Sequence, residues 1–142
     1  MEWLNVVKSV DEYSRVLQTR LGKVSIILHG SFARGDFNVW SDVDLIIVSE
    51  KFYGLRVLDR YDLLNPTPPR VEPIPLTPEE FEANLEKPVW RYALNRGSVI
   101  FVDDYNLSTA MNRHGIRFAT REQLVEKINS MIEAISGTMQ SS

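Results

Sequence analysis

Two short apolar runs place the strongest constraint on how this chain folds. They span residues 24–28 and 43–48, and both are rich in β-branched side chains that favour an extended backbone. Short runs of this composition predict two buried strands. The first run stops at Gly30-Ser31, and residues 38–41 are predicted to form the loop that leads into the second.

Apolar residues at three- and four-residue spacing predict amphipathic helices along much of the chain. Glycine is expected to end the first helix at Gly22 and the last one near Gly137. Thr77 and Glu80 have the spacing of a capping box, and the same pattern recurs from Thr120. The predicted helices cover residues 3–21, 52–64, 78–96 with an interruption at Pro88, and 121–136, with a frayed tail at 137–142.

Two further runs, 71–76 and 99–102, complete the predicted sheet. Pro73 and Pro75 have no backbone N–H to donate, which indicates that the first of these strands lies at a sheet edge. The fold class is therefore α/β (α+β), a small mixed β-sheet of about four strands flanked by helices. The predicted organisation is one domain at 1–142, with a core at about 20–104, a C-terminal helical extension at about 105–136, and no assignment for 104–120.

Composition excludes several classes of function. The chain has 142 residues, a net charge of −3 and no cysteine, so disulfides, thiolate metal sites and Cys nucleophiles are absent. The acidic balance argues against a broad nucleic-acid-binding face but not against a small nucleotide. The first residues do not resemble a signal peptide and no apolar run approaches the ~20 residues of a membrane span. We expect a cytoplasmic protein.

Asp42 and Asp44 carry the strongest chemical signal. Residues i and i+2 of a strand point to the same side, so both carboxylates project together while Val43 and Leu45 pack on the other face. Two such charges raise each other's pKa unless cations bind them, and Mg²⁺ takes carboxylates together with substrate phosphates. The alternative is structural: Asp42 caps a turn and Asp44 pairs with an arginine.

Gly30 and Ser31 favour the first interpretation. A strand that ends in Gly-Ser can bring backbone N–H groups and a hydroxyl close to a phosphate, although an ordinary turn often has the same sequence. A P-loop is excluded, because no Gly-Lys-Ser/Thr sequence occurs. Arg34 follows one turn later, where it contacts either a phosphate or solvent.

The joint pattern HGSFARGDFNVWSDVDLIIV resembles the G-S-x10-D-x-D signature of the DNA polymerase beta-like nucleotidyltransferase superfamily, and most closely its minimal nucleotidyltransferases. The similarity covers about residues 20–104. It implies a nucleotidyltransferase fold in which Gly30 and Ser31 hold phosphates and Asp42 and Asp44 bind two Mg²⁺ ions, or Mn²⁺. Glu72 occupies the place of the third acid, as metal ligand and base, where the family more often has Asp.

The resemblance further implies transfer of a nucleoside monophosphate, AMP from ATP above all, to an acceptor hydroxyl. Small domains of this family often modify a tyrosine of a HEPN-domain partner, as the antitoxin of a toxin–antitoxin pair. Two alternatives stay open: a small-molecule nucleotidyltransferase of the aminoglycoside-modifying kind, and a catalytically weak or inactive nucleotide-binding or interaction module. The alternative of an inactive module rests on Glu72, where the family more often has Asp, and on the apolar face of the C-terminal helix.

Several other side chains have two interpretations at this stage. The stripe of Met131, Ile132 and Ile135 indicates either core packing or a homodimer or partner surface. His29 is interpreted as a packed residue at a strand end, and Asp36 as a turn residue. Arg56 and Arg60 face either a triphosphate or solvent.

Overall fold

The computed structural model describes residues 2–38 and 40–140, and its elements alternate between helix and strand. Val39, within the predicted loop, and residues 141–142 of the predicted frayed tail lie outside the described residues. The elements in chain order are α1 (Glu2–Leu21), β1 (Ser25–His29), α2 (Ser31–Arg34), β2 (Val43–Val48), η1 (Glu50–Phe52), α3 (Val57–Leu64), β3 (Val71–Leu76), α4 (Pro78–Leu85), α5 (Pro88–Arg96), β4 (Ser98–Asp103), α6 (Leu107–Arg113), β5 (Ala119–Thr120) and α7 (Arg121–Gln140).

The strands form one mixed sheet in the order β3-β2-β1-β4-β5. β1 runs antiparallel to β2 and β4, whereas the β2–β3 and β4–β5 pairs are parallel. The edge position predicted for β3 from its two prolines is confirmed. The sheet has five strands where the sequence predicts about four, because β5 has only two residues, too few to produce a hydrophobic pattern.

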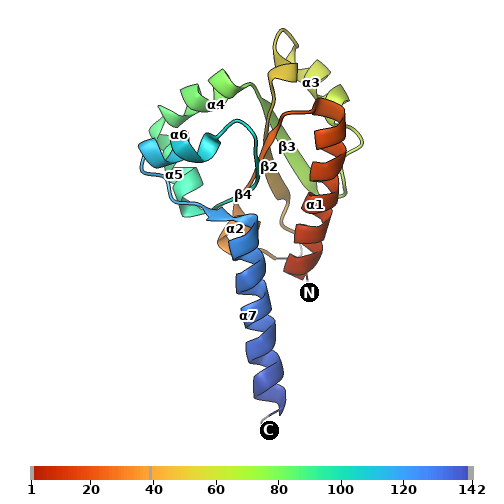
Figure 1. Cartoon of the computed structure of the whole chain (residues 1–142), viewed down its shortest axis with the longest axis vertical. Helices are drawn as coiled ribbons and strands as arrows, with labels where there is room; N and C mark the ends of the chain where they lie inside the picture. Colours follow the sequence, from red (N-terminus) through yellow and green to blue (C-terminus); the bar gives the residue numbers. More distant parts are fainter. Residues whose placement is uncertain (1, 39, 141–142) are drawn as a thin grey trace.

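The sheet is buried on both faces, which explains why its central strands are almost entirely apolar (Figure 1). Successive side chains of the strands point to opposite faces of the sheet and pack into two separate cores. Leu45 and Ile47 of β2 pack with α1, α3 and the start of α7. Ile46 and Val48 point the other way and pack with α4, α5 and α6.

The helices of the structure differ from the predicted ones at three places. α2 is a short helix that the sequence pattern does not predict, since four residues contain too little periodicity. The helix expected at 52–64 is two pieces, η1 and α3, separated by Gly54 at a φ of 73°. The last helix does not end near Gly137 but continues to Gln140.

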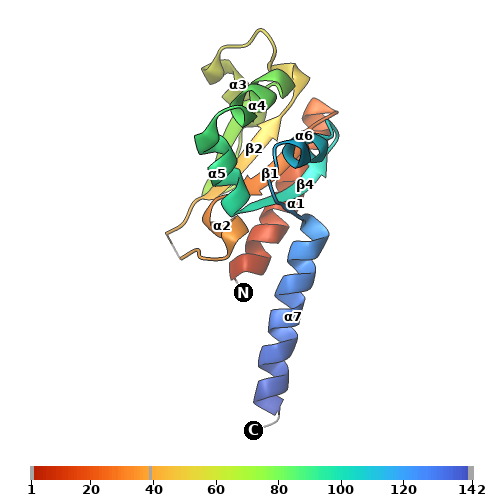
Figure 2. The same ribbon diagram turned by 90° about the vertical axis from the view of Figure 1, so that its left-hand side faces the viewer.

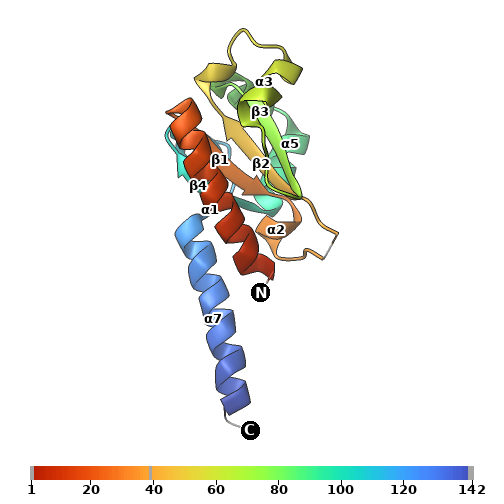
Figure 3. The ribbon, with the colours of Figure 1, turned by 90° about the vertical axis from the view of Figure 1, so that its right-hand side faces the viewer.

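α7 extends away from the sheet (Figures 2 and 3). Leu124 and Ile128 in its first half are buried against α1 and β4, and of the stripe with two interpretations only Ile132 packs against this core, where it is partly buried. Met131 and Ile135 further along are 43% and 53% exposed. Within the described chain, no helix combines the length and apolarity needed to cross a membrane.

The two predicted capping boxes form. Thr77 accepts a hydrogen bond from the Glu80 amide, and the Glu80 carboxylate accepts one from the Thr77 amide. The same carboxylate also accepts hydrogen bonds from both terminal nitrogens of the Arg60 guanidinium, at 2.6 and 3.2 Å. These bonds lower the pKa of Glu80. Arg60 thereby connects α3 with α4. Thr120 and Gln123 exchange the equivalent pair of bonds at the start of α7.

Tyr13 provides a test of packing between α1 and α3. Its hydroxyl donates to the Leu64 carbonyl at 2.7 Å, and burial raises its pKa to about 12. Between pH 10 and 12 the unfolded chain loses this proton while the folded chain keeps it, so the stabilisation is complete below pH 10 and disappears toward pH 12. Tyr13→Phe should lower the free energy of unfolding at pH 8 by about 1 kcal/mol and weaken its decline above pH 9.

Urea titrations from pH 7 to 11.5 measure both effects. Tyr92→Phe is the matched control, because the Tyr92 side chain lies on the surface and is 65% exposed. Identical pH profiles for wild type and Tyr13→Phe would contradict the role assigned to the buried hydroxyl.

Candidate active site

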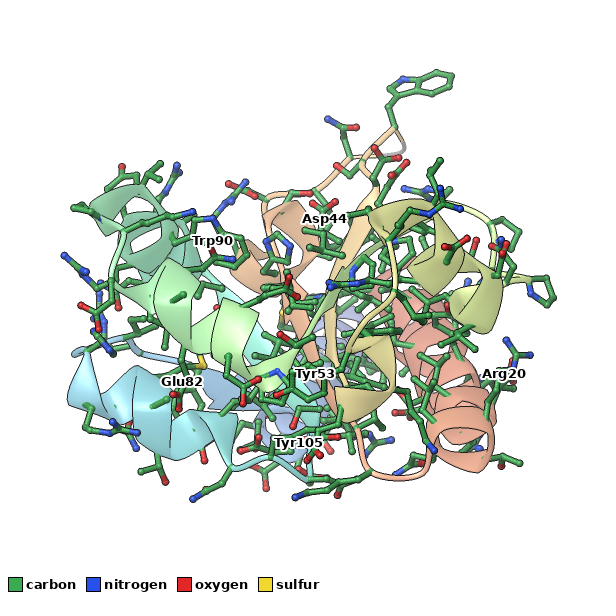
Figure 4. All side chains as sticks on the ribbon, turned by 90° about the horizontal axis from the view of Figure 1, so that it is seen from above. Arg20, Asp44, Tyr53, Glu82, Trp90 and Tyr105 are labelled. Carbon is green, nitrogen blue, oxygen red and sulfur yellow. The ribbon has the colours of Figure 1, made fainter. Side chains whose placement is uncertain are left out.

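The candidate active site lies where β1 ends and where β2 and β3 begin. Asp44 is paired with His29 on one side and with Glu72 on the other, in the antiparallel and parallel registers of the sheet. Residues paired across neighbouring strands share a face, so these three side chains belong to the face covered by α4, α5 and α6. Asp44 and Trp90 of α5 lie on the same side of the molecule in Figure 4, and Tyr105 lies on the opposite side.

The surroundings of Asp44 destabilise the charged form of its carboxylate. Its pKa is raised above the ordinary value, first by partial burial and then by the nearby charges of Asp42 and Glu72. The positive charge of Arg34 opposes part of this rise. Three of the acids singled out from the sequence therefore interact electrostatically in the folded chain. A cation beside them would remove the repulsion that they create.

Gly30 makes the close approach to Asp44 possible. Its φ of 81° and ψ of −152° belong to a region that only glycine adopts without strain. A Cβ atom on Gly30 would lie 2.7 Å from Oδ2 of Asp44, well inside van der Waals contact. The Gly-Ser turn is thus shaped around the carboxylate, and the two halves of the sequence motif meet in space.

Ser31 begins α2, which packs on the end of the sheet through buried Phe32. With four residues, α2 is too short for a sizeable helix dipole, so any phosphate affinity here comes from local N–H groups and the Ser31 hydroxyl. Arg34 donates to both carboxylate oxygens of Asp36 at 3.1–3.2 Å. Its charge nevertheless acts on Asp44, which keeps it within electrostatic reach of the site.

The carboxylates supply the oxygen ligands that Mg²⁺ or Mn²⁺ prefers. Asp42 and Glu72 are exposed and Asp44 is half-buried. Within residues 2–38 and 40–140, no three His, Asp or Glu side chains already converge as ligands of a single ion. The donor chemistry therefore fits a divalent cation that the carboxylates share with substrate phosphates rather than a closed cage made by protein alone.

Arg70 is a residue of the site that the sequence analysis did not find. Its guanidinium donates to the Ser41 carbonyl at 2.6 and 3.1 Å and to the Asn38 carbonyl at 3.5 Å. Its own carbonyl accepts from the Val43 amide at 2.8 Å, and the guanidinium carbon lies 5.5 Å from the ring centroid of Phe32. One side chain thus joins the segments that carry Ser31, Asp42 and Glu72. A basic residue two positions before the third acid is a weak signal in sequence.

His29 is packed at the end of β1, as expected. Burial, with the nearby charge of Arg34, lowers its pKa to about 4, so the ring is neutral at pH 7. In the described part of the chain no donor or acceptor reaches its buried Nε2 atom. Arg56 and Arg60 do not join the site: Arg56 pairs with Asp59, and Arg60 bonds Glu80 and backbone carbonyls.

Comparisons with known proteins agree with this fold. A family model for the nucleotidyltransferase domain matches residues 10–135. The chain belongs to this nucleotidyltransferase family. A crystal structure at 1.40 Å resolution, of a Sulfolobus solfataricus protein provisionally assigned as a nucleotidyltransferase, has a TM-score of 0.52 at 23% identity. That likeness covers 57% of this chain and 75% of the other, and it shows the shared fold. No curated protein gives a significant match.

A methyl group at Gly30 tests the contact with Asp44. Gly30→Ala should destabilise this nucleotidyltransferase by about 1–3 kcal/mol through backbone strain, and should abolish Mg²⁺–ATP binding by displacing the carboxylate. Gly54→Ala is the control, since Gly54 also has a positive φ but nothing within 4 Å of the added methyl. Thermal unfolding and calorimetric titration give the two readouts. Equal nucleotide affinity in both variants would contradict the proposed contact.

The role of Arg70 in the site can be tested by comparison with Arg20, which also donates hydrogen bonds to backbone carbonyls but lies elsewhere. Arg20 donates to the Leu63 and Asn65 carbonyls at 3.0 and 2.7 Å and lies away from Asp44 in Figure 4. Each Arg→Gln change should cost about 1 kcal/mol of stability or less. Arg70→Gln alone should weaken Mg²⁺–ATP binding, about tenfold, because it frees the segment before Asp42. Equal binding by the two variants would make Arg70 purely structural.

Proposed function

We propose that this nucleotidyltransferase domain binds a nucleoside triphosphate, ATP by preference, and transfers its nucleoside monophosphate to an acceptor hydroxyl. The observation that carries the proposal is the half-buried Asp44, fitted against Gly30 with the charges of Asp42 and Glu72 beside it. A fold does not retain such repulsion for stability. A site of this kind suits a ligand that arrives with both phosphates and cations.

The proposed reaction is an in-line displacement at the α-phosphorus. The acceptor oxygen forms a bond to phosphorus, the bond between the α-phosphorus and the bridging oxygen breaks, and pyrophosphate leaves. Glu72 accepts the proton of the acceptor hydroxyl, since it is exposed on an edge strand where an acceptor can approach it. Gly30, Ser31 and Arg34 hold the phosphates, and Arg70 keeps Asp42 in place.

Asp42, Asp44 and Glu72 would hold Mg²⁺, with Mn²⁺ as a substitute. Two such ions, when bound, neutralise charge that develops on the attacking and leaving oxygens. The fit rests on the all-oxygen donor set and on the raised pKa of Asp44, which a nearby cation would lower again.

A hydroxyl on a protein is the acceptor that we favour, specifically a tyrosine on a HEPN-domain partner in a toxin–antitoxin pair, as the sequence resemblance implies. The surface is compatible with a macromolecular acceptor, because Trp40 in the loop before Asp42 is 88% exposed. The outer part of α7, with Met131 and Ile135 exposed, offers a second apolar face for that partner or for a second copy of the chain.

A second candidate is a module that binds nucleotide but does not turn it over. It is favoured by one observation: the described acids do not converge as a set of three metal ligands. Glu72 is also one methylene longer than the Asp usual in the family. The two candidates agree on nucleotide binding and differ in transfer of label from the α-position.

Thermal unfolding with and without Mg²⁺–ATP tests the binding step. Ligand at 100 times its Kd adds about 2.7 kcal/mol of stability, a rise of several degrees at ~2–4 °C per kcal/mol. The double variant Asp42→Asn/Asp44→Asn should lose this rise. Without ligand the same variant should be at least as stable as wild type, because the change removes charge repulsion.

Asp62→Asn is the matched control, since Asp62 is an exposed carboxylate on α3 outside the site. It should keep the full rise. Incubation of wild type and its partner with ATP labelled at the α- or γ-phosphate then separates the two candidates. Transfer of α-label alone, lost in the double variant, supports the enzyme. A ligand-induced rise with no transfer supports the binding module, and no rise with Mg²⁺ or Mn²⁺ contradicts both.

A further inference from the structure

A pocket lies beside the acids on the same face of the sheet. Its volume is about 200 Å³, and it opens between the sheet and α5. Its lining residues are almost all apolar and come from β1, β2, β3 and α5: His29, Ile46, Ile74, Val89, Trp90, Ala93 and Leu94. The rim is reachable from solvent, since Val89 is 68% exposed and Ala93 is also exposed.

The strand register fixes the position of this pocket relative to the acids. Ile46 follows Asp44 by two residues and Ile74 follows Glu72 by two, so each apolar wall residue stands about 7 Å further along the strand on the same face. His29, which completes the wall, is bonded directly to Gly30. The pocket therefore borders the end of the sheet at which the Gly-Ser turn and the carboxylates lie together.

The chemistry of the walls selects a flat, uncharged and mostly apolar group. An apolar cavity of about 150 Å³ accepts a benzene ring, so this pocket has room for an aromatic ring system. Trp90 offers an aromatic surface on which a ring can stack. Among the lining residues His29 also has a polar side chain, and its buried Nε2 has no partner among the described residues and can bond one polar edge atom of a ring.

We propose that this pocket is the nucleobase subsite: the base lies between Trp90 and the strands, with one ring-edge atom bonded to His29. The inference rests on the proposed function, because it takes the phosphates to be held at Gly30-Ser31. In a nucleotide, one ribose joins the anionic phosphates to a flat base. The Gly-Ser turn and the pocket lie side by side, so the phosphates can bind at the turn while the base enters the pocket. The competing occupant is an aromatic ring of the acceptor, which the test distinguishes.

Filling the mouth of the pocket tests the inference. Ala93→Trp places a large ring at the rim without burying it, so the fold should persist. Calorimetric titrations compare Mg²⁺–ATP with Mg²⁺–ribose 5′-triphosphate, which lacks only the base. We expect wild type to bind ATP about 5- to 140-fold more tightly than ribose 5′-triphosphate, the range for base stacking. Ala93→Trp should bring the ATP affinity down to that of ribose 5′-triphosphate and leave the latter unchanged.

Tyr92→Trp is the matched control, because it adds bulk to the exposed side of α5 outside the pocket. It should bind both ligands as wild type does. An ATP preference that survives Ala93→Trp overturns the inference, as does a variant with normal ATP affinity but a raised KM for the acceptor, which would give the pocket to the acceptor. Failure of wild type to bind either triphosphate would instead overturn the proposed function.

Discussion

The contact between the Gly30 backbone and the Asp44 carboxylate is the constraint on which the site depends. It needs a glycine conformation, a short turn into α2, and a carboxylate at the start of an internal strand, where burial and two like charges oppose ionisation. None of these features stabilises the fold. Together they form a close contact with no room for a Cβ atom, beside a concentration of negative charge. The free energy that this arrangement costs must be offset by the two cores elsewhere.

The sheet can carry both the site and the two cores because successive side chains of each strand point to opposite faces. In β2 the odd-numbered residues pack under α1 and α3, and the even-numbered ones begin with Asp44 and continue with Ile46 and Val48 under α4, α5 and α6. A single strand thus carries a charged end and an apolar remainder on one face. Since neighbouring strands share the register, the acids and the apolar pocket are necessarily adjacent.

Much of this arrangement can be predicted from the sequence because the signals are local. The strands around Leu28 and Leu45, the capping box at Thr77, and the electrostatic interaction of Asp42 with Asp44 follow from periodicity and side-chain chemistry. What the sequence did not predict depends on few residues or on distant ones. β5 is too short to show a period, α7 continues through Gly137, and Arg70 acts only through contacts with carbonyls some 30 residues earlier.

Arg70 also shows why the motif residues alone do not make the site. Asp44 and Glu72 lie on two neighbouring strands, Asp42 directly precedes the first of them, and the Gly-Ser turn follows a third strand, so the site draws on several separate segments. Arg70 bonds the carbonyl just before Asp42, lies against Phe32 just after Ser31, and precedes Glu72 by two residues. A rigid planar guanidinium is suited to hold three such segments at once. The charges of Asp42 and Glu72 oppose ionisation of Asp44, and the bonds from Arg70 to the backbone just before Asp42 hold these segments together against that repulsion.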